Sequence, residues 1–120
     1  MVLMVGVNMC SEYKKGYNFE RRVRKYLEGL GYTVFRAAGS KPIDLIVFTH
    51  GAGFILECKV SKKYLRKENV ERMLKIHEKT GLIPVFAYRD KDKKIRFLNL
   101  LTNKEMLFPH VNSLDKYVSL

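Results

Sequence analysis

Three charged residues lie within or beside two short apolar runs of the chain. Asp44 begins one run, and Glu57 and Lys59 interrupt the next. Mg²⁺ is usually held by one or two protein carboxylates because it keeps several of its waters. A lysine beside such a pair adds a fixed positive charge. If the two runs lie side by side, these residues could hold a divalent cation and activate a water for hydrolysis.

Both runs have the length and composition of β-strands. They are rich in Val, Ile, Leu and Phe and are bounded by Gly or Pro, so the sequence predicts strands over 43–49 and 54–60. The residues between them, 50–53, contain two glycines and are predicted to form a tight loop. The charged residues should therefore lie on neighbouring antiparallel strands.

The predicted loop length decides which charged side chains meet. A loop over 50–53 places Asp44 opposite Lys59, with Glu57 as a diagonal neighbour on the same face, roughly 7 Å away at the backbone. A slip of one residue would turn Asp44 to the other face. The plain alternative is an exposed sheet face with an Asp44–Lys59 ion pair. Apolar residues on both faces of both strands favour a covered sheet, in which carboxylates persist only when paired or bound to metal.

The rest of the chain supplies elements that could cover this sheet. Apolar periodicity and stop signals predict helices over 17–30 and 68–80, and further strands over 32–37, 83–89 and 95–101. The predicted fold class is therefore α/β, with a central mixed five-stranded sheet flanked by helices in the order αβββαββ.

The length of 120 residues suits one domain, and we predict a single domain over 1–120. Residues 1–13 carry no clear pattern and are expected to form a mobile N-terminal extension. The tail over 102–120 is not assigned to an element.

Two other polar residues are candidates for the same site. Glu20 falls at the edge of the apolar stripe of the first helix, where it is either a first-turn charge favoured by the helix dipole or a member of a site. Ser40 lies at the tip of the link that leads into Asp44, where it is either a turn residue or a site residue.

The charge of the chain indicates the kind of partner. Lysine and arginine number 23 against 12 acidic residues, a net charge of +11, which favours nucleic acid first and an anionic membrane second. No apolar run approaches the roughly 20 residues needed to cross a bilayer, so no membrane association is expected. Cys10 and Cys58 have no metal-ligand spacing and fit a reducing cytoplasm.

Basic residues near the predicted site are expected to contact nucleic-acid phosphates and the path of the backbone more than base edges. These residues are Lys14, Lys15, Arg21, Arg36, Lys41, Lys62, Lys63 and Arg66.

Three motifs of the chain resemble those of the archaeal-type Holliday junction resolvases, which belong to the restriction-endonuclease-like nucleases. They are Gly-x-x-x-Glu at 16–20, Ala-Gly-Ser-Lys-x-x-Asp-Leu at 38–45 and Glu-Cys-Lys-Val at 57–60. The resemblance covers about residues 14–100 and includes Gly-x-Ile-Pro-Val at 81–85. The departures from the family lie at the two ends of the chain.

The resemblance implies a restriction-endonuclease-like core and a metal-dependent endonuclease that resolves four-way junctions. It implies that Asp44, Glu57 and the backbone carbonyl of Cys58 bind Mg²⁺, for which Mn²⁺ may substitute, and that Glu20 supports the ion or its water. It also implies that Lys59 orients or deprotonates the attacking water and that Ser40 sits beside the scissile phosphate.

A four-way junction has two-fold symmetry and is resolved by two related nicks, so the expected enzyme is a homodimer. It would be cytoplasmic and DNA-associated, with branched DNA as its partner and no small-molecule cofactor. Two alternatives stay open: a related nuclease that cuts duplex, flap or other branched DNA, and a DNA-binding module without chemistry.

Overall fold

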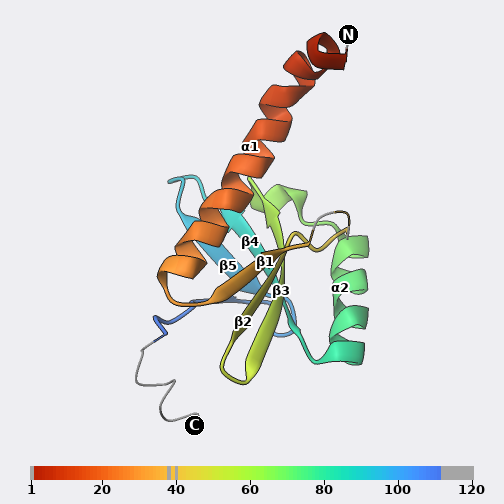
Figure 1. Cartoon of the computed structure of the whole chain (residues 1–120). Helices are drawn as coiled ribbons and strands as arrows, with labels where there is room; N and C mark the ends of the chain where they lie inside the picture. Colours follow the sequence, from red (N-terminus) through yellow and green to blue (C-terminus); the bar gives the residue numbers. More distant parts are fainter. Residues whose placement is uncertain (1, 38, 40, 112–120) are drawn as a thin grey trace.

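The computed structural model describes residues 2–37, 39 and 41–111, with side chains from residue 15 onward. A six-stranded sheet lies between two helices, and α1 covers one face while α2 lies against the other (Figure 1). The elements are α1 (Val2–Gly29), β1 (Thr33–Arg36), β2 (Leu45–Thr49), β3 (Ala52–Lys59), the short 3₁₀ helix η1 (Lys62–Tyr64), α2 (Lys67–Thr80), β4 (Ile83–Arg89), β5 (Ile95–Asn99) and β6 (Lys104–Met106).

The strands lie in the sheet in the same order as in the chain. All neighbouring pairs are antiparallel except β3 and β4, which run parallel. This pair is joined through α2, because parallel strands need a crossover connection. The predicted α/β class with a mixed sheet flanked by helices is confirmed.

The sheet has a hydrophobic core on each face. Phe19, Val23 and Leu27 of α1 pack in one buried cluster with side chains from β2 to β5. Met73 of α2 packs in the other, which includes Ile55 of β3. Because β3 is covered on both faces, its apolar side chains continue at odd and even positions alike. Glu57 is therefore a carboxylate within a buried strand.

The hairpin between β2 and β3 is tighter than predicted. The turn is His50–Gly51, with Gly51 at φ 67°, and Thr49 pairs with Ala52. The register that the predicted 50–53 loop implied, with Asp44 opposite Lys59, is wrong by two residues, because Ala52 and Gly53 belong to β3 and not to the loop. Since strand faces alternate with a period of two, this error leaves each side chain on the face that was predicted.

Other differences lie at the ends of the chain. The first helix was predicted from residue 17, but α1 begins at Val2, so the predicted extension over 1–13 is helical over most of its length. Residues 2–15 contain no proline, so nothing stops the helix from continuing toward the N-terminus. The sheet has six strands and not five, because residues 104–106 of the unassigned tail pair with β5. None of the described helices is both long and apolar enough to span a membrane.

Candidate active site

Asp44 immediately precedes β2, and Glu57 lies near the end of β3. Leu45 pairs with Leu56 at this end of the hairpin, and the backbone N–H of Asp44 donates to the carbonyl of Leu56 at 2.8 Å. Asp44 and Glu57 are the next residues beyond that last pair, and the charge of Asp44 acts on Glu57. Asp44 therefore does not pair with Lys59 as predicted.

The backbone of Cys58 holds the Asp44 carboxylate. The Cys58 N–H donates to Asp44 Oδ2 at 2.7 Å, and Asp44 is the residue immediately before β2. The N–H and C=O of one strand residue point to the same side, so the Cys58 carbonyl also faces this end of β2. Its thiol is buried in the α1 core, and burial raises its pKa well above the ordinary value. Cys58 thus offers the site its backbone and not its sulfur.

Glu57 is held by α2. Its side chain is only 2% exposed, and its Oε2 accepts a 2.8 Å hydrogen bond from Nδ2 of Asn69. The other oxygen, Oε1, is buried and has no hydrogen-bond partner among the described residues. A buried carboxylate oxygen without a partner is costly. A cation beside Asp44 and Glu57 would remove that cost, so this pair fits a hard divalent ion.

The protonation of the two acids reflects the same burial. Burial is the largest influence on each and raises the pKa of both carboxyls above their ordinary values. The charge of Asp44 raises the pKa of Glu57 further, while Lys59 lowers the pKa of both. Arg36 also lowers the pKa of Asp44 and Arg66 that of Glu57, yet burial outweighs these nearby cations and both pKa values stay raised.

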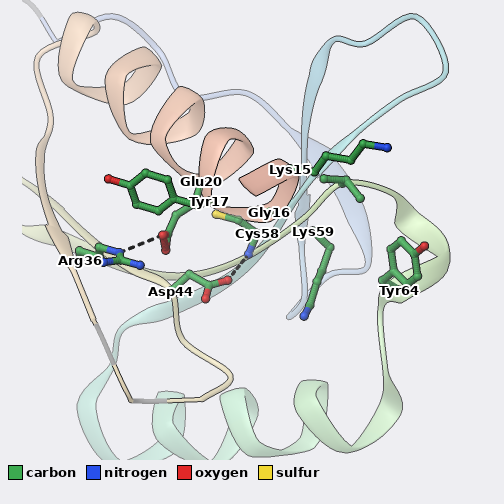
Figure 2. Close-up of a pocket in the computed structure, with 10 residues that line it drawn as sticks. Lys15, Gly16, Tyr17, Glu20, Arg36, Asp44, Cys58, Lys59 and Tyr64 are labelled. Carbon is green, nitrogen blue, oxygen red and sulfur yellow. Dashed lines mark hydrogen bonds and ion pairs between the residues drawn. The ribbon is translucent and has the colours of Figure 1, made fainter. Parts of the chain in front are cut away.

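A cavity of about 450 Å³ opens beside these residues (Figure 2). Asp44 and Lys59 line it, while Glu57, which is hydrogen-bonded to Asn69 of α2, is not among its described lining residues. The lining comprises Lys15, Gly16, Tyr17, Glu20, Arg36, Asp44, Cys58, Lys59, Val60 and Tyr64. The strand ends thus bring a carboxylate and an ammonium to one wall of a solvent-open pocket.

Glu20 enters the cavity from α1 but has a different partner. It is 9% exposed, and its Oε2 forms an ion pair with Nε of Arg36 at 3.0 Å. No group of three His, Cys, Asp or Glu side chains among the described residues is close enough to hold a metal. The structure therefore brings Asp44 and Glu57 together and places Glu20 beside them on Arg36.

Some of the predicted phosphate contacts line this cavity or flank it. Lys15 and Arg36 line the cavity, and Lys63 of η1 lies over the ring of Tyr64. Lys62 lies over the ring of Tyr88, with its Nζ 5.7 Å from the centroid. These cations surround the wall that carries Asp44 and Lys59.

Other predicted residues lie further out or outside the description. Arg21 lines a smaller cleft with Arg24. Lys41 is exposed in the link before β2. Arg66 is the N-cap residue of α2, without a side-chain cap hydrogen bond, and its charge lowers the pKa of Glu57. Ser40 and the side chain of Lys14 lie outside the described residues.

Three residues near the site were missed by the sequence analysis. Asn69 was hidden inside a predicted helix, because its contact with Glu57 depends on how α2 packs on the sheet. Tyr17 and Tyr64 line the cavity from α1 and η1. Tyr64 directly follows Lys63 and Tyr17 lies two residues after Lys15, and this interleaving of aromatic and basic residues was the available signal.

The chain matches a known protein family. The family model of the archaeal Holliday junction resolvases (Hjc) matches residues 11–113, which include all the predicted site residues. The chain belongs to the archaeal Holliday junction resolvase family. Over 103 residues it is 40% identical to the crossover junction endodeoxyribonuclease Hjc of Methanocaldococcus jannaschii, covering 83% of this chain and 68% of that protein.

A solved structure shares the fold of this Hjc family member. It is the Hjc Holliday junction resolvase of Archaeoglobus fulgidus, with a TM-score of 0.63 and 22% identity. The match covers 72% of this chain and 74% of that one. The predicted restriction-endonuclease-like fold and the predicted family resemblance are both confirmed.

Proposed function

We propose that this Holliday junction resolvase cuts DNA by metal-assisted phosphodiester hydrolysis centred on Asp44, Glu57 and Lys59. The observation that supports the proposal is the buried Glu57 carboxylate, one oxygen of which has no hydrogen-bond partner among the residues that the structure describes. A structural role would have paired both oxygens, because burying an unsatisfied charge destabilises a fold. The family membership of the chain agrees with this use of the two acids.

Asp44 and Glu57 would hold Mg²⁺, or Mn²⁺ in its place, with the Cys58 carbonyl as a backbone ligand and Glu20 as a nearby acid. When bound, such an ion supplies an acidified water and positive charge next to the scissile phosphate. The Cys58 N–H fixes one oxygen of Asp44, and Asn69 fixes one oxygen of Glu57. Each carboxylate is thereby oriented before DNA arrives, which lowers the reorganisation needed for the reaction.

Lys59 is two residues beyond Glu57 on β3, so its side chain leaves the same face of the strand. It lines the cavity, where a phosphate could enter from solvent. Its ammonium would orient the attacking water and stabilise the negative charge that develops on the phosphorus oxygens. Ser40 is proposed beside the same phosphate on the grounds of its motif alone.

The partner would be four-way DNA, contacted mainly through phosphates by the basic residues around the cavity. One site per chain makes one nick, and a junction needs two nicks related by two-fold symmetry. A homodimer provides both sites with the same symmetry as the substrate.

One assay tests the proposal. Cleavage of a four-way junction is compared with cleavage of a linear duplex of the same arm sequence, with and without Mg²⁺. We expect paired nicks in the junction only with the metal. Equal cutting of both DNAs would indicate a less selective nuclease, and binding without cutting would indicate a DNA-binding module.

A further inference from the structure

Two exposed tyrosines stand on opposite sides of the active-site cavity. Tyr17 lies on α1 and Tyr64 on η1, and Figure 2 shows Lys59 between them. Their exposed fractions are 38% and 41%, large for aromatic side chains beside a buried site. Neither ring is needed for the cation, whose ligands would be oxygen atoms. The cavity thus has two aromatic walls that the hydrolysis itself does not use.

Each ring carries a cation. The Arg36 guanidinium lies 5.1 Å from the centroid of Tyr17, and the Lys63 ammonium lies 5.3 Å from the centroid of Tyr64. A cation over one face of a ring orients it and leaves the opposite face and the edge for another partner. The same cations attract phosphate. Each side of the cavity therefore combines an aromatic ring on which a base could stack with a cation that could contact the phosphate of the same nucleotide.

The cavity is larger than hydrolysis requires. Its volume of about 450 Å³ lies within the range of pockets that enclose organic ligands, well beyond one metal ion and one phosphate. Val60 and Gly16 also line it and add apolar and open surface. A cavity with a charged floor and aromatic sides matches a nucleotide, which has an anionic phosphate and a flat base.

We propose that Tyr17 and Tyr64 stack on unstacked bases next to the scissile phosphate, and that this contact contributes to the choice of branched over linear DNA. This inference rests on the proposed function. In a linear duplex every base is already stacked, so withdrawing one is costly. At a branch point the stack is interrupted and the cost is lower. Aromatic stacking is sequence-tolerant because every base has a flat face, as a shape-selective enzyme requires.

The test measures binding without metal, so that no DNA is cut. Wild type, Tyr17→Ala, Tyr64→Ala and the double variant are titrated against a four-way junction and against a linear duplex of the same sequence. The junction carries 2-aminopurine at the branch point, whose fluorescence reports stacking. Phenylalanine at either position keeps the ring, and Tyr26→Ala removes an equally exposed tyrosine that lines other clefts.

We expect each alanine variant to lose about tenfold in junction affinity and little in duplex affinity. The fluorescence change that wild type produces at the branch point should be lost in the double variant. The phenylalanine variants and Tyr26→Ala should behave like wild type. Thermal melting checks that each variant is folded. Both rings are exposed, so their removal should leave the core intact.

Two results would overturn the inference. One is a double variant with wild-type junction affinity and fluorescence, and the other is an equal loss of affinity for junction and duplex. Either result leaves the proposed function intact if wild type still cuts the junction. Conversely, a wild type that binds and unstacks the branch point but never cuts it contradicts the proposed function and supports the contact.

Discussion

Asn69 Nδ2 donates to Glu57 Oε2 at 2.8 Å, and this single bond fixes the orientation of an acid whose other oxygen is unpartnered among the described residues. It links the first turn of α2 to the middle of the sheet. If Glu57 binds the proposed cation, Asn69 is a positioning residue, since such residues fix a metal ligand without touching the ion.

Asn69→Ala should therefore weaken metal binding. We expect about a 10- to 100-fold loss in metal affinity or cleavage rate, the range typical of residues that orient metal ligands. Junction binding should be unchanged. The measurement is the Mg²⁺ dependence of single-turnover cleavage, with Glu71→Ala on the exposed side of α2 as the matched control. A wild-type metal dependence for Asn69→Ala would contradict the assignment.

The three central residues should be separable from DNA binding. Asp44→Asn, Glu57→Gln and Lys59→Ala should each reduce junction cleavage by at least about 100-fold, because each removes a charge aimed at the reacting phosphate. Binding measured without metal should survive. Loss of binding in all three variants, with the fold intact by melting, would argue against catalytic roles.

The stability of the protein should depend on metal and on pH. The pKa values of Asp44 and Glu57 are raised in the folded state, chiefly by burial, so the folded chain holds these protons more tightly than the unfolded chain. Without metal, stability should therefore fall as pH rises through the raised pKa values and recover as pH falls toward the ordinary values of 3.8 and 4.5.

Mg²⁺ should reverse this trend, because it binds the ionised pair. We expect Mg²⁺ to raise the Tm at neutral pH and to have a smaller effect near pH 5, where protons compete for the carboxylates. Glu57→Gln should melt higher than wild type without metal and respond less to Mg²⁺. Melting curves in EDTA and in Mg²⁺ measure this difference in Tm. A wild-type Tm that does not change with Mg²⁺ at neutral pH would count against the proposed metal site.

DNA binding should be strongly dependent on salt. If about six phosphates are neutralised, the logarithm of junction affinity should fall with the logarithm of salt concentration at a slope of about −5. Substituting Lys62 and Lys63 together should make the slope shallower by about 2. Anisotropy titrations at several salt concentrations measure this, and a flat response would exclude the basic surface as the binding site.

The active unit should be a dimer. Sedimentation at micromolar concentration should give about twice the chain mass of 14.0 kDa, and the two nicks in one junction should be coupled. A monomer with full resolving activity would refute this assembly.

Most of the fold and the central pair of acids could be predicted from the sequence, for reasons specific to each element. β4 was predicted over the residues it occupies, because Gly81 and a charged turn bound an apolar run. The register of β2 and β3 was wrong by two residues, since glycine at position 53 was counted as loop. Asp44 and Glu57 still shared a face because the error was even.

What the sequence could not supply was contact between distant segments. Arg36 forms an ion pair with Glu20 and lies over Tyr17, across a separation that no local pattern encodes. The same holds for Asn69, whose neighbour depends on how α2 docks. β6 spans only Lys104–Met106, too short for a periodic signal.

The burial of β3 on both faces, and its bonding to a strand on each edge, has a kinetic consequence. Backbone amides in such a strand exchange with solvent only when the whole sheet opens. The amides of Ile55 and Leu56, which pair with both β2 and β4, should thus rank with the slowest in the molecule. The proposed acids would then stand at the end of the most rigid strand, and accommodation of a flexible branched substrate would fall to the surrounding rim.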